Sequence, residues 1–162
     1  MSVREDKVVF PNGEKGIYSV VDKASFALII PMFENGFQLV NQYRYSVSAR
    51  YWEFPQGAYE EQPNIDPLVL AQEELREETG LTANILQKIG FFYEAYGYST
   101  QGFHIFLATD LNAGEAKREE SEQGMVTKKV SFTQFEQMVL DGSIVDAPTI
   151  SAYALLKIKK II

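Results

Sequence analysis

Three glutamates lie in residues 71–81 at spacings that place their side chains on one face of a helix. They are Glu74, Glu77 and Glu78, and residues three and four positions apart are neighbours on a helix surface. Because like charges at these spacings repel, the cluster costs stability as a bare surface. A hard divalent cation relieves that repulsion, since Mg²⁺ and Mn²⁺ take carboxylate oxygens as ligands. The cluster therefore predicts a magnesium or manganese site, with a solvated acidic helix face as the alternative.

The segment that carries the glutamates has the signals of a helix with two different faces. Asp66 can cap its start, Pro67 fits the first helical position, and Gly80 suits a left-handed end. Just upstream, residues 51–57 are typical of a strand that ends at a Pro/Gly turn. A strand, a glycine turn, a loop and an acidic helix, in this order, predict a site for a metal ion and a phosphate group. The other stripe of this helix is apolar enough to bury and comprises Leu68, Ala71, Leu75 and Thr79.

The acidic segment also carries a family motif. Residues 74–81, Glu-Leu-Arg-Glu-Glu-Thr-Gly-Leu, resemble the second half of the Nudix box, G-x5-E-x7-R-E-U-x-E-E-x-G-U, in which U is a bulky aliphatic residue. Gly57 resembles the opening glycine, although seventeen positions separate it from the first glutamate of the run where the pattern has fifteen. Residues 63–65 replace the mid-box glutamate, and Glu73 stands at the arginine position. In the family that arginine orients the helix carboxylates, and here Arg76 is the available substitute.

The resemblance extends beyond the box, over roughly residues 7–156. Residues 42–44 (Gln-Tyr-Arg), 52–55 (Trp-Glu-Phe-Pro) and 142–150 resemble the ADP-ribose and nucleotide-sugar pyrophosphatase branch of the family. That branch often has a proline downstream of the box, whereas residues 94–99 contain none. The resemblance implies hydrolysis of the pyrophosphate bond of a nucleoside diphosphate sugar, such as ADP-ribose or GDP-mannose, to a nucleoside monophosphate and a sugar phosphate. The missing proline favours a broad range of such sugars over a strict preference for ADP-ribose.

The resemblance also implies which residues hold the metal. The expected ligands are the carboxylates of Glu74, Glu77 and Glu78 together with the backbone carbonyl of Gln56. Magnesium is the first choice and manganese the second, since both suit oxygen ligands. A water molecule bound to such a metal has a lowered pKa and can attack one phosphorus of the substrate.

The general base is expected outside the helix. In the resembling branch, a glutamate on a loop after the late strands activates the water, and the matching stretch is residues 117–124. Glu122 is favoured over Glu119 and Glu120 because it lies nearest the next predicted strand. Glu77 is counted among the catalytic residues as well as among the metal ligands. A solvated charged loop is the alternative for each loop glutamate.

Substrate contacts are expected from charged and aromatic residues around the box. Arg44 matches the branch arginine that meets the diphosphate or ribose, with a surface ion pair as the alternative. Glu53 matches a glutamate near the metal site, and aromatic rings can stack on a base or belong to the core. His104 is the only histidine and alternates with apolar neighbours, so it is interpreted as a sheet residue. The candidate contacts are Arg44, Trp52, Glu53, Gly57, Tyr18 and Tyr98.

The pattern of strands and helices predicts an α+β protein, and the resemblance makes this a Nudix fold, a mixed β-sheet sandwiched between α-helices. A capping box at Ser131 and Gln134 should open one helix, with Phe132, Phe135, Met138 and Val139 on its apolar side. Pro148 should open a last helix that buries Ile150, Ala154 and Ile158. Strands are expected at residues 7–10, 16–21, 25–32, 37–43, 51–57, 85–93, 103–108 and 125–130.

Composition narrows the class of protein. The 162 residues fit one Nudix hydrolase domain spanning residues 1–162. The net charge of −7 argues against long nucleic acid as a partner. No apolar stretch has the length, roughly 20 residues, of a membrane span, and the absence of cysteine fits a cytoplasmic protein.

The sequence is also compatible with two other functions and with one kind of assembly. Some Nudix domains sense nucleotide sugars without cleaving them, and others remove RNA caps. The intact glutamates favour catalysis over sensing, and the acidic balance weighs against RNA. The branch often forms homodimers in which N-terminal strands cross to the partner, and the aromatic and β-branched residues near the N-terminus are compatible with that.

Overall fold

The computed structural model describes residues 1–59, 65–116 and 124–162. Three α-helices and a short 3-10 helix accompany the strands of the described residues. The helices are α1 (Pro67–Thr79), α2 (Phe132–Leu140), α3 (Ala147–Ile158) and the 3-10 helix η1 (Tyr45–Val47). The strands are β1 (Ser2–Val9), β2 (Lys15–Asp22), β3 (Phe26–Phe33), β4 (Gly36–Arg44), β5 (Ala49–Glu53), β6 (Gln56–Gly57), β7 (Leu81–Tyr93), β8 (Gly102–Ala113) and β9 (Val126–Ser131).

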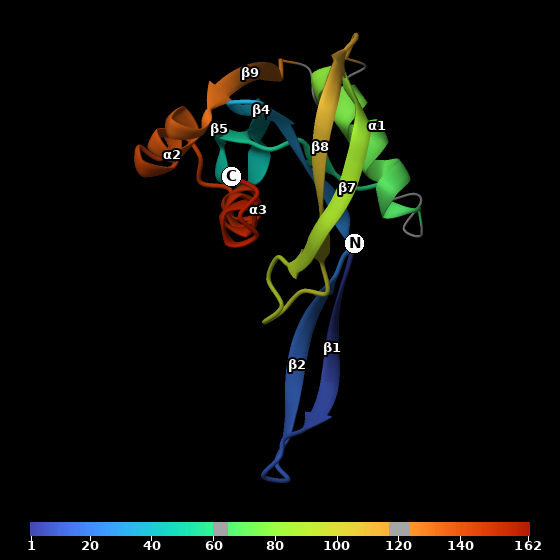
Figure 1. The fold of residues 1–162 in the computed structure, drawn as a ribbon. Helices are drawn as coiled ribbons and strands as arrows, with labels where there is room; N and C mark the ends of the chain where they lie inside the picture. The colour runs from blue at the N-terminus through green and yellow to red at the C-terminus, as the bar shows by residue number, and fades with distance from the viewer. Residues whose placement is uncertain (60–64, 117–123) are drawn as a thin grey trace.

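The main sheet is mixed. Its strands run in the order β5-β4-β3-β8-β7, while β6 pairs with β3 and β9 pairs with β4. The pair β3–β8 is parallel, and the other pairs are antiparallel. The hairpin of β1 and β2 forms a separate two-stranded sheet that extends away from the body of the molecule (Figure 1).

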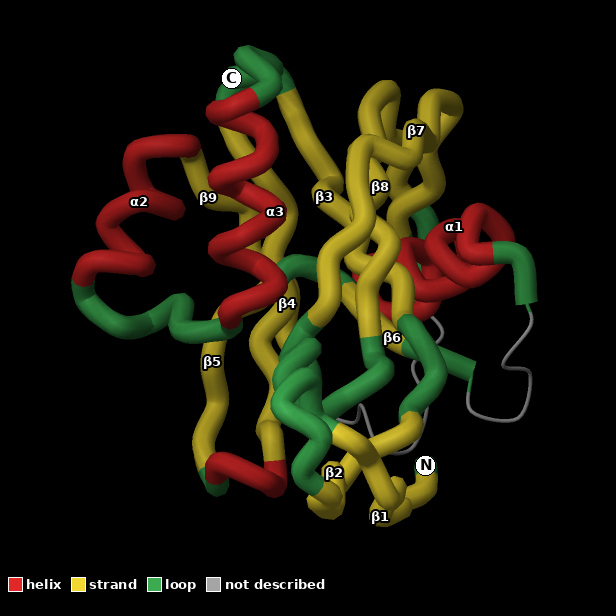
Figure 2. Tube along the Cα trace, turned by 90° about the horizontal axis from the view of Figure 1, so that it is seen from below, coloured by secondary structure: helices red, strands yellow, loops and turns green. Residues whose placement is uncertain are grey.

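Helices cover both faces of this sheet, with α1 on one side and α2 and α3 on the other (Figures 1 and 2). Because side chains alternate along a strand, β3 contributes side chains to two hydrophobic clusters, one on each face of the sheet. Leu28 and Ile30 pack with Phe135 of α2 and Leu156 of α3. The intervening Ala27 and Ile29 pack in a second cluster against α1, whose buried apolar residues are Leu70, Ala71 and Leu75. The predicted α+β architecture, with a mixed sheet between helices, is confirmed.

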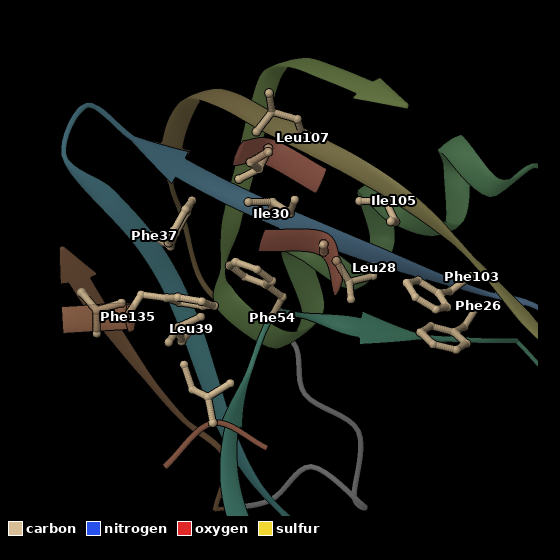
Figure 3. Close-up of a cluster of buried hydrophobic side chains, with 14 residues drawn as sticks. Phe26, Leu28, Ile30, Phe37, Leu39, Phe54, Phe103, Ile105, Leu107 and Phe135 are labelled. Carbon is tan, nitrogen blue, oxygen red and sulfur yellow. The ribbon is translucent and has the colours of Figure 1, made fainter. Parts of the chain in front are cut away.

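Aromatic rings fill the core beneath α2 and α3 (Figure 3). The ring of Phe54 stacks on Phe135, with centroids 5.4 Å apart. Phe37 meets Phe54 edge-on at 5.2 Å, an arrangement that aromatic pairs favour. Phe54 directly follows β5, so this cluster anchors the chain just before it enters the predicted site.

The expected caps of α1 are present. The Asp66 side chain accepts a hydrogen bond from the backbone N–H of Leu68 at 2.9 Å. Gly80 adopts φ 73°, and its N–H donates to the carbonyl of Arg76 at 2.9 Å. The prediction that Leu68 belongs to the packed stripe is wrong, because it is 39% exposed and Leu70 is buried in its place. Leu68 and Val69 in the first turn are exposed, so the packed stripe begins at Leu70.

The last helix is rotated relative to its prediction. The capping box of α2 at Ser131 and Gln134 is confirmed. In α3, however, Ala154 and Ile158 are exposed. The Thr149 hydroxyl accepts a hydrogen bond from the N–H of Phe54 at 2.9 Å, which turns residues 148 and 149 inward. The residues one and two turns later on that face, Ala152 and Leu156, are therefore the buried ones.

The sheet opens between β3 and β4, and this opening positions the predicted site. The two strands pair only at their turn, where Met32 faces Phe37 and Phe33 faces Gly36. Farther along β3, the short strand β6 takes the place of β4 beside Ala27 and Leu28. Gln56 and Gly57 are thereby held at the centre of the molecule, beside α1.

No helix in the described ranges is long and apolar enough to cross a membrane.

Candidate active site

A cleft of about 580 Å³ lies where β4, β6 and α1 meet. The helix α1 contributes carboxylates to it, and β4 contributes an arginine. The loop after β6 supplies an aromatic side chain. The cleft is lined by Gln42, Tyr43, Arg44, Tyr45, Ser46, Gln56, Gly57, Ala58, Tyr59, Glu74, Glu77 and Glu78. It brings together the three predicted metal-ligating glutamates, Gln56, Gly57 and Arg44.

Two of the three glutamates are buried. Glu78 is 1% exposed and Glu74 is 6% exposed. A carboxylate oxygen of Glu78 accepts a hydrogen bond from the backbone N–H of Gln56 at 3.1 Å. The alternative of a solvated acidic face is therefore excluded for these two side chains. Burying carboxylates side by side is costly unless polar groups or a cation compensate the charge.

The absence of a side chain at Gly57 makes room for one of these carboxylates. A Cβ atom added to Gly57 would fall on the carboxylate of Glu74, within 2.5 Å of its carbon. Cβ atoms in proteins essentially never approach other heavy atoms so closely, so a side chain at this position would have to displace the Glu74 carboxylate. The structure thus supplies the physical reason for a glycine at the position that resembles the opening of the box.

The third glutamate, Glu77, lies at the edge of the cleft beside Tyr59. The Tyr59 hydroxyl donates to a carboxylate oxygen of Glu77 at 3.5 Å. Burial raises the pKa of Tyr59 to about 12, and the charges of Glu77, Glu73 and Glu74 add to the effect. The phenol therefore stays protonated and acts as a donor. Arg76, the expected substitute for the box arginine, approaches Glu77 only to 3.9 Å and is half-exposed.

The donor set fits a hard divalent cation in its chemistry. Carboxylate oxygens from Glu74, Glu77 and Glu78 are the ligands that Mg²⁺ and Mn²⁺ prefer. Gly57 leaves the space that one of these carboxylates needs. In the described part of the chain, however, no three acidic or imidazole side chains already converge closely enough to enclose an ion. The residues match the cation in type, and their side chains must still draw together around it.

Beside the carboxylates, Arg44 is held by a buried partner. Its Nη2 donates to Glu53 Oε1 at 2.5 Å, and its Nε donates to Glu53 Oε2 at 3.4 Å. Gln42 Nε2 donates to the same Oε1 at 2.7 Å. Burial raises the pKa of Glu53, the nearby Arg44 counteracts that rise, and Asp146 adds to it. Arg44 thus forms the ion pair considered as its alternative and also lines the cleft.

The side chain of Gln56 was not expected to take part. Its Nε2 donates to Glu53 Oε2 at 3.3 Å and to Asp146 Oδ2 at 3.2 Å. Asp146 is the N-cap of α3, a role that the Asp-Ala-Pro sequence could have indicated. The contact of Gln42 with Glu53 could also have been predicted. Gln42 lies on the same face of β4 as Arg44 and diagonally across from Glu53 on β5.

The aromatic candidates do not line this cleft in the described chain. Trp52 packs against the core, with Lys128 Nζ 5.9 Å from its ring. Tyr18 lies on the hairpin, and its hydroxyl donates to the carbonyl of Gly97 at 2.5 Å. Tyr98 is 61% exposed near the same junction. His104 lies in β8 opposite Ala27, as expected for a sheet residue.

The general-base candidates Glu119, Glu120 and Glu122 lie outside the described residues. The chain resumes at Gly124, whose carbonyl accepts a hydrogen bond from Arg50 Nη1 at 3.0 Å. Met125, which follows it, is buried. Gly124 is thus held against β5, the strand that also carries Glu53.

Comparisons with known proteins agree with the geometry. Residues 23–153 match the NUDIX domain family. The chain is 31% identical to an ADP-ribose pyrophosphatase of Bacillus subtilis over 96% of its own length and 84% of the relative. It is 31% identical to an ADP-ribose pyrophosphatase of Mycobacterium tuberculosis over 93% and 73% of the two chains. It is also 26% identical to a methanol dehydrogenase activator of Bacillus methanolicus over 99% and 86%.

A solved structure shows the same fold. A crystal structure of an ADP compounds hydrolase superposes with a TM-score of 0.84 at 21% identity, covering 96% of this chain and 83% of the other. The strand order, the two helical layers and the placement of α1 are thus features of a known architecture.

Proposed function

The chain belongs to the Nudix family and is a Nudix hydrolase, and from this premise we propose that it cleaves the pyrophosphate bond of a nucleoside diphosphate sugar with a bound divalent cation, Mg²⁺ or Mn²⁺. The products would be a nucleoside monophosphate and a sugar phosphate: the hydroxyl of one water molecule joins the attacked phosphorus, the bond from that phosphorus to the bridging oxygen breaks, and the remaining proton balances the leaving phosphate. ADP-ribose is the first substrate to test, because two relatives at 31% identity are ADP-ribose pyrophosphatases.

One observation carries this proposal: the same cleft presents buried carboxylates and an arginine. Glu74 and Glu78 can hold a cation, and Arg44 can donate to phosphate oxygens. A diphosphate needs both kinds of partner, since its charge must be neutralised while its two phosphates are held in place. A cleft with only carboxylates would repel such a substrate.

Each residue of the cleft has a proposed role in the reaction. The bound cation would neutralise the diphosphate and lower the pKa of the attacking water. Glu74, Glu77 and Glu78, with the backbone carbonyl of Gln56, would hold that cation. Arg44 would bind the diphosphate or ribose, and Glu53 would hold Arg44 in turn.

A loop glutamate would complete the reaction as general base. Glu122 remains our first choice, ahead of Glu119 and Glu120, for taking the proton of the attacking water. Trp52, Tyr18 and Tyr98 remain candidates for stacking on the base, although within one chain they do not line the cleft. A second chain could bring an aromatic residue of its hairpin near the substrate.

The proposed assembly is a homodimer that uses the hairpin. Isolated two-stranded hairpins are marginal in water, yet this one exposes Val3, Val9 and Ile17 at 64–70%. Burial against a second copy would remove these side chains from water. Light scattering after size exclusion tests the assembly: deletion of residues 1–22 should give a monomer, whereas a full-length monomer would contradict the dimer.

A substrate panel with magnesium tests the proposed reaction. ADP-ribose, GDP-mannose, UDP-glucose, diadenosine polyphosphates, NADH and capped RNA are offered to the wild-type protein and to Glu78→Gln. We expect hydrolysis of at least one nucleotide sugar, reduced by about 10²-fold or more in the variant, as for loss of one electrostatic contact in an active site. Glu34→Gln, an exposed turn glutamate, is the matched control and should behave as wild type.

The same panel separates the alternatives. Tight binding of a nucleotide sugar without cleavage at any magnesium concentration would identify a sensor instead of an enzyme. Cleavage of capped RNA alone would identify an RNA-cap pyrophosphohydrolase. Near wild-type turnover by Glu78→Gln at saturating magnesium would overturn the assignment of Glu78 as a ligand.

A further inference from the structure

The Gln56 side chain lies between two carboxylates, and we propose that it is a positioning residue for substrate binding. By tying Glu53 to Asp146, the amide fixes the guanidinium of Arg44 at the edge of the cleft. The substrate rests on the function proposed above, whereas the arrangement of the side chains does not. Gln56 is 9% exposed and belongs to β6, so its backbone is already fixed.

The neighbours of Gln56 determine which way its amide points. Nε2 faces Glu53 Oε2 at 3.3 Å and Asp146 Oδ2 at 3.2 Å. The NH₂ group has two N–H donors, one for each carboxylate. The reversed amide would set its oxygen against both acceptors and repel them. Only a side chain with two donors can bridge these acids, so neither Ala nor Glu could replace Gln56 here.

This orientation leaves a buried acceptor unsatisfied. Gln56 Oε1 is out of contact with solvent and has no hydrogen-bond partner among the described residues. An unsatisfied buried polar atom costs roughly 1–3 kcal/mol. The protein thus tolerates a cost at this atom while the opposite end of the amide holds the two carboxylates. Such a cost is typical of residues kept for a task other than stability.

The hydrogen bonds of the Gln56 amide act on Arg44 through Glu53. Gln42 holds Glu53 Oε1, and Gln56 holds Oε2, so the buried carboxylate is fixed from both sides. Arg44 meets this carboxylate through Nε and Nη2. That contact uses the side of the guanidinium and directs its Nη1–Nη2 edge elsewhere. Arg44 is 40% exposed at the cleft, where this edge can meet a phosphate.

Asp146, the other carboxylate that the Gln56 amide binds, is fixed at the start of α3. Asp146 Oδ2 also accepts from the N–H of Thr149 at 2.8 Å, which caps α3. The Thr149 hydroxyl accepts from Phe54 N–H, so α3 is fixed to the segment between β5 and β6. The bond from the backbone N–H of Gln56 to Glu78 is independent of the side chain at position 56. Side-chain variants of Gln56 should therefore affect Arg44 more than the glutamates of α1.

A double-mutant cycle between Gln56→Met and Arg44→Lys tests the proposal. Met has similar length and neither donor. With saturating magnesium and the best nucleotide sugar, Gln56→Met should raise KM about 10-fold and change kcat by less than about 3-fold, as for loss of ground-state binding. Because Gln56 acts through Arg44, the double variant should have nearly the KM of Arg44→Lys alone. Independent, multiplying effects would overturn the proposal, and so would an unchanged KM in Gln56→Met.

Thr149→Val is the matched control for a purely structural role. It removes the buried hydrogen bond from the N–H of Phe54, in which the side chains of Glu53 and Gln56 take no part. We expect a lower melting temperature with KM within about 2-fold of wild type. If Thr149→Val raised KM as much as Gln56→Met, the effect would belong to the junction as a whole and the proposal would fail. Gln56→Asn, whose shorter amide cannot span both acids, replaces Gln56→Met if that variant is insoluble, with the same expected rise in KM.

A crystallographic comparison keeps this test separate from the proposed function. If the wild-type protein cleaves nothing in the panel, the proposed function fails. The structure of the Gln56→Met variant still decides whether Gln56 positions Arg44. The guanidinium of Arg44 should move by about 1 Å or more, a displacement large enough to impair binding geometry. An Arg44–Glu53 pair that stays in its wild-type position would overturn the role of Gln56.

Discussion

The carboxylate of Glu74 occupies the space that a side chain on Gly57 would need. The two residues come from different elements, β6 and α1, and are brought together because β6 pairs with β3 where β4 turns away. The constraint on residue 57 thus comes from a tertiary contact with a side-chain carboxylate, and not from a left-handed backbone φ. A glycine at this position lets the Glu74 carboxylate lie directly against the strand that carries Gln56.

Gly57→Ala should impair hydrolysis more than stability. The added Cβ must push Glu74 from its position, and a displaced ligand of about 1 Å can cost roughly 10²-fold in rate. Steady-state kinetics and a thermal melt measure the two effects. Gly97→Ala is the control and should retain wild-type kinetics, because a Cβ at Gly97 would meet no atom within 4 Å. Full activity in Gly57→Ala would contradict the placement of Glu74 as a metal ligand.

Removal of divalent metal should abolish activity without unfolding the chain. EDTA should stop hydrolysis, and added Mg²⁺ or Mn²⁺ should restore it. Because the cation binds the folded state, magnesium at about 100 times its Kd should add about 2.7 kcal/mol to stability, visible as a rise of several degrees in Tm. Glu78→Gln should show a smaller rise. Activity that survives exhaustive chelation would exclude the metal-dependent reaction.

The loop glutamates should matter for rate more than for binding. Substituting Glu119, Glu120 and Glu122 together with glutamine should lower kcat by about 10²–10⁴-fold, the usual range for a general base. The pH–rate profile should lose its acid limb in the same variant. Single substitutions then identify the base, with Glu122→Gln expected to account for most of the loss. A triple variant with unchanged kcat would place the base elsewhere.

The rotation of α3 predicts which residues stabilise the fold. Leu156 is fully buried, so Leu156→Ala should cost about 2–5 kcal/mol in the free energy of unfolding. Ile158, two residues later, is 77% exposed, so Ile158→Ala should stay within about 0.5 kcal/mol of wild type. Urea denaturation measures both. A larger loss for Ile158→Ala than for Leu156→Ala would restore the orientation expected from the sequence.

An exposed ion pair between α2 and α3 should make stability depend on pH. The pKa of Glu136 is lowered by a hydrogen bond from the Tyr153 hydroxyl and by Lys157. A carboxylate whose pKa is lower in the folded chain than in the unfolded chain stabilises the fold above the unfolded value of 4.5. That contribution is lost as the pH falls through the folded-state pKa.

Glu136→Gln isolates this pH dependence. The wild-type Tm should fall more steeply than that of the variant between about pH 6 and pH 3, because only the wild-type protein has this carboxylate to protonate. The effect should be small, since Glu136 and Lys157 are half-exposed and surface pairs contribute little. Parallel curves for the two proteins would show that the pair contributes nothing.

Local patterns predicted the part of the site that depends on one helix. Glu74, Glu77 and Glu78 share a face because helical spacing is a property of a few consecutive residues. The caps at Asp66 and Gly80 were equally local and are confirmed. The runs of apolar residues similarly predicted β3 and β8, because strands buried on both faces are continuously apolar.

Contacts between segments far apart in the chain could not be predicted from the sequence. Tyr59 reaches Glu77, and Gln56 reaches Asp146, only because the fold brings β6 beside α1 and α3. The error in α3 has the same origin. Its periodicity allowed more than one buried face, and the hydrogen bond from Phe54 to Thr149 selected one of them.

The parallel pairing of β3 with β8 has a consequence for how the chain folds. Phe26 lies opposite Phe103, so the central strand stays without this neighbour until 77 further residues have been synthesised. Such non-local pairing slows folding, because loop-closure entropy is lost before the contacts form. During synthesis the exposed edge of β3, whose side chains are apolar on both faces, is open to other chains. Aggregation of this protein should therefore be governed less by its finished surface than by the time that elapses before β8 arrives.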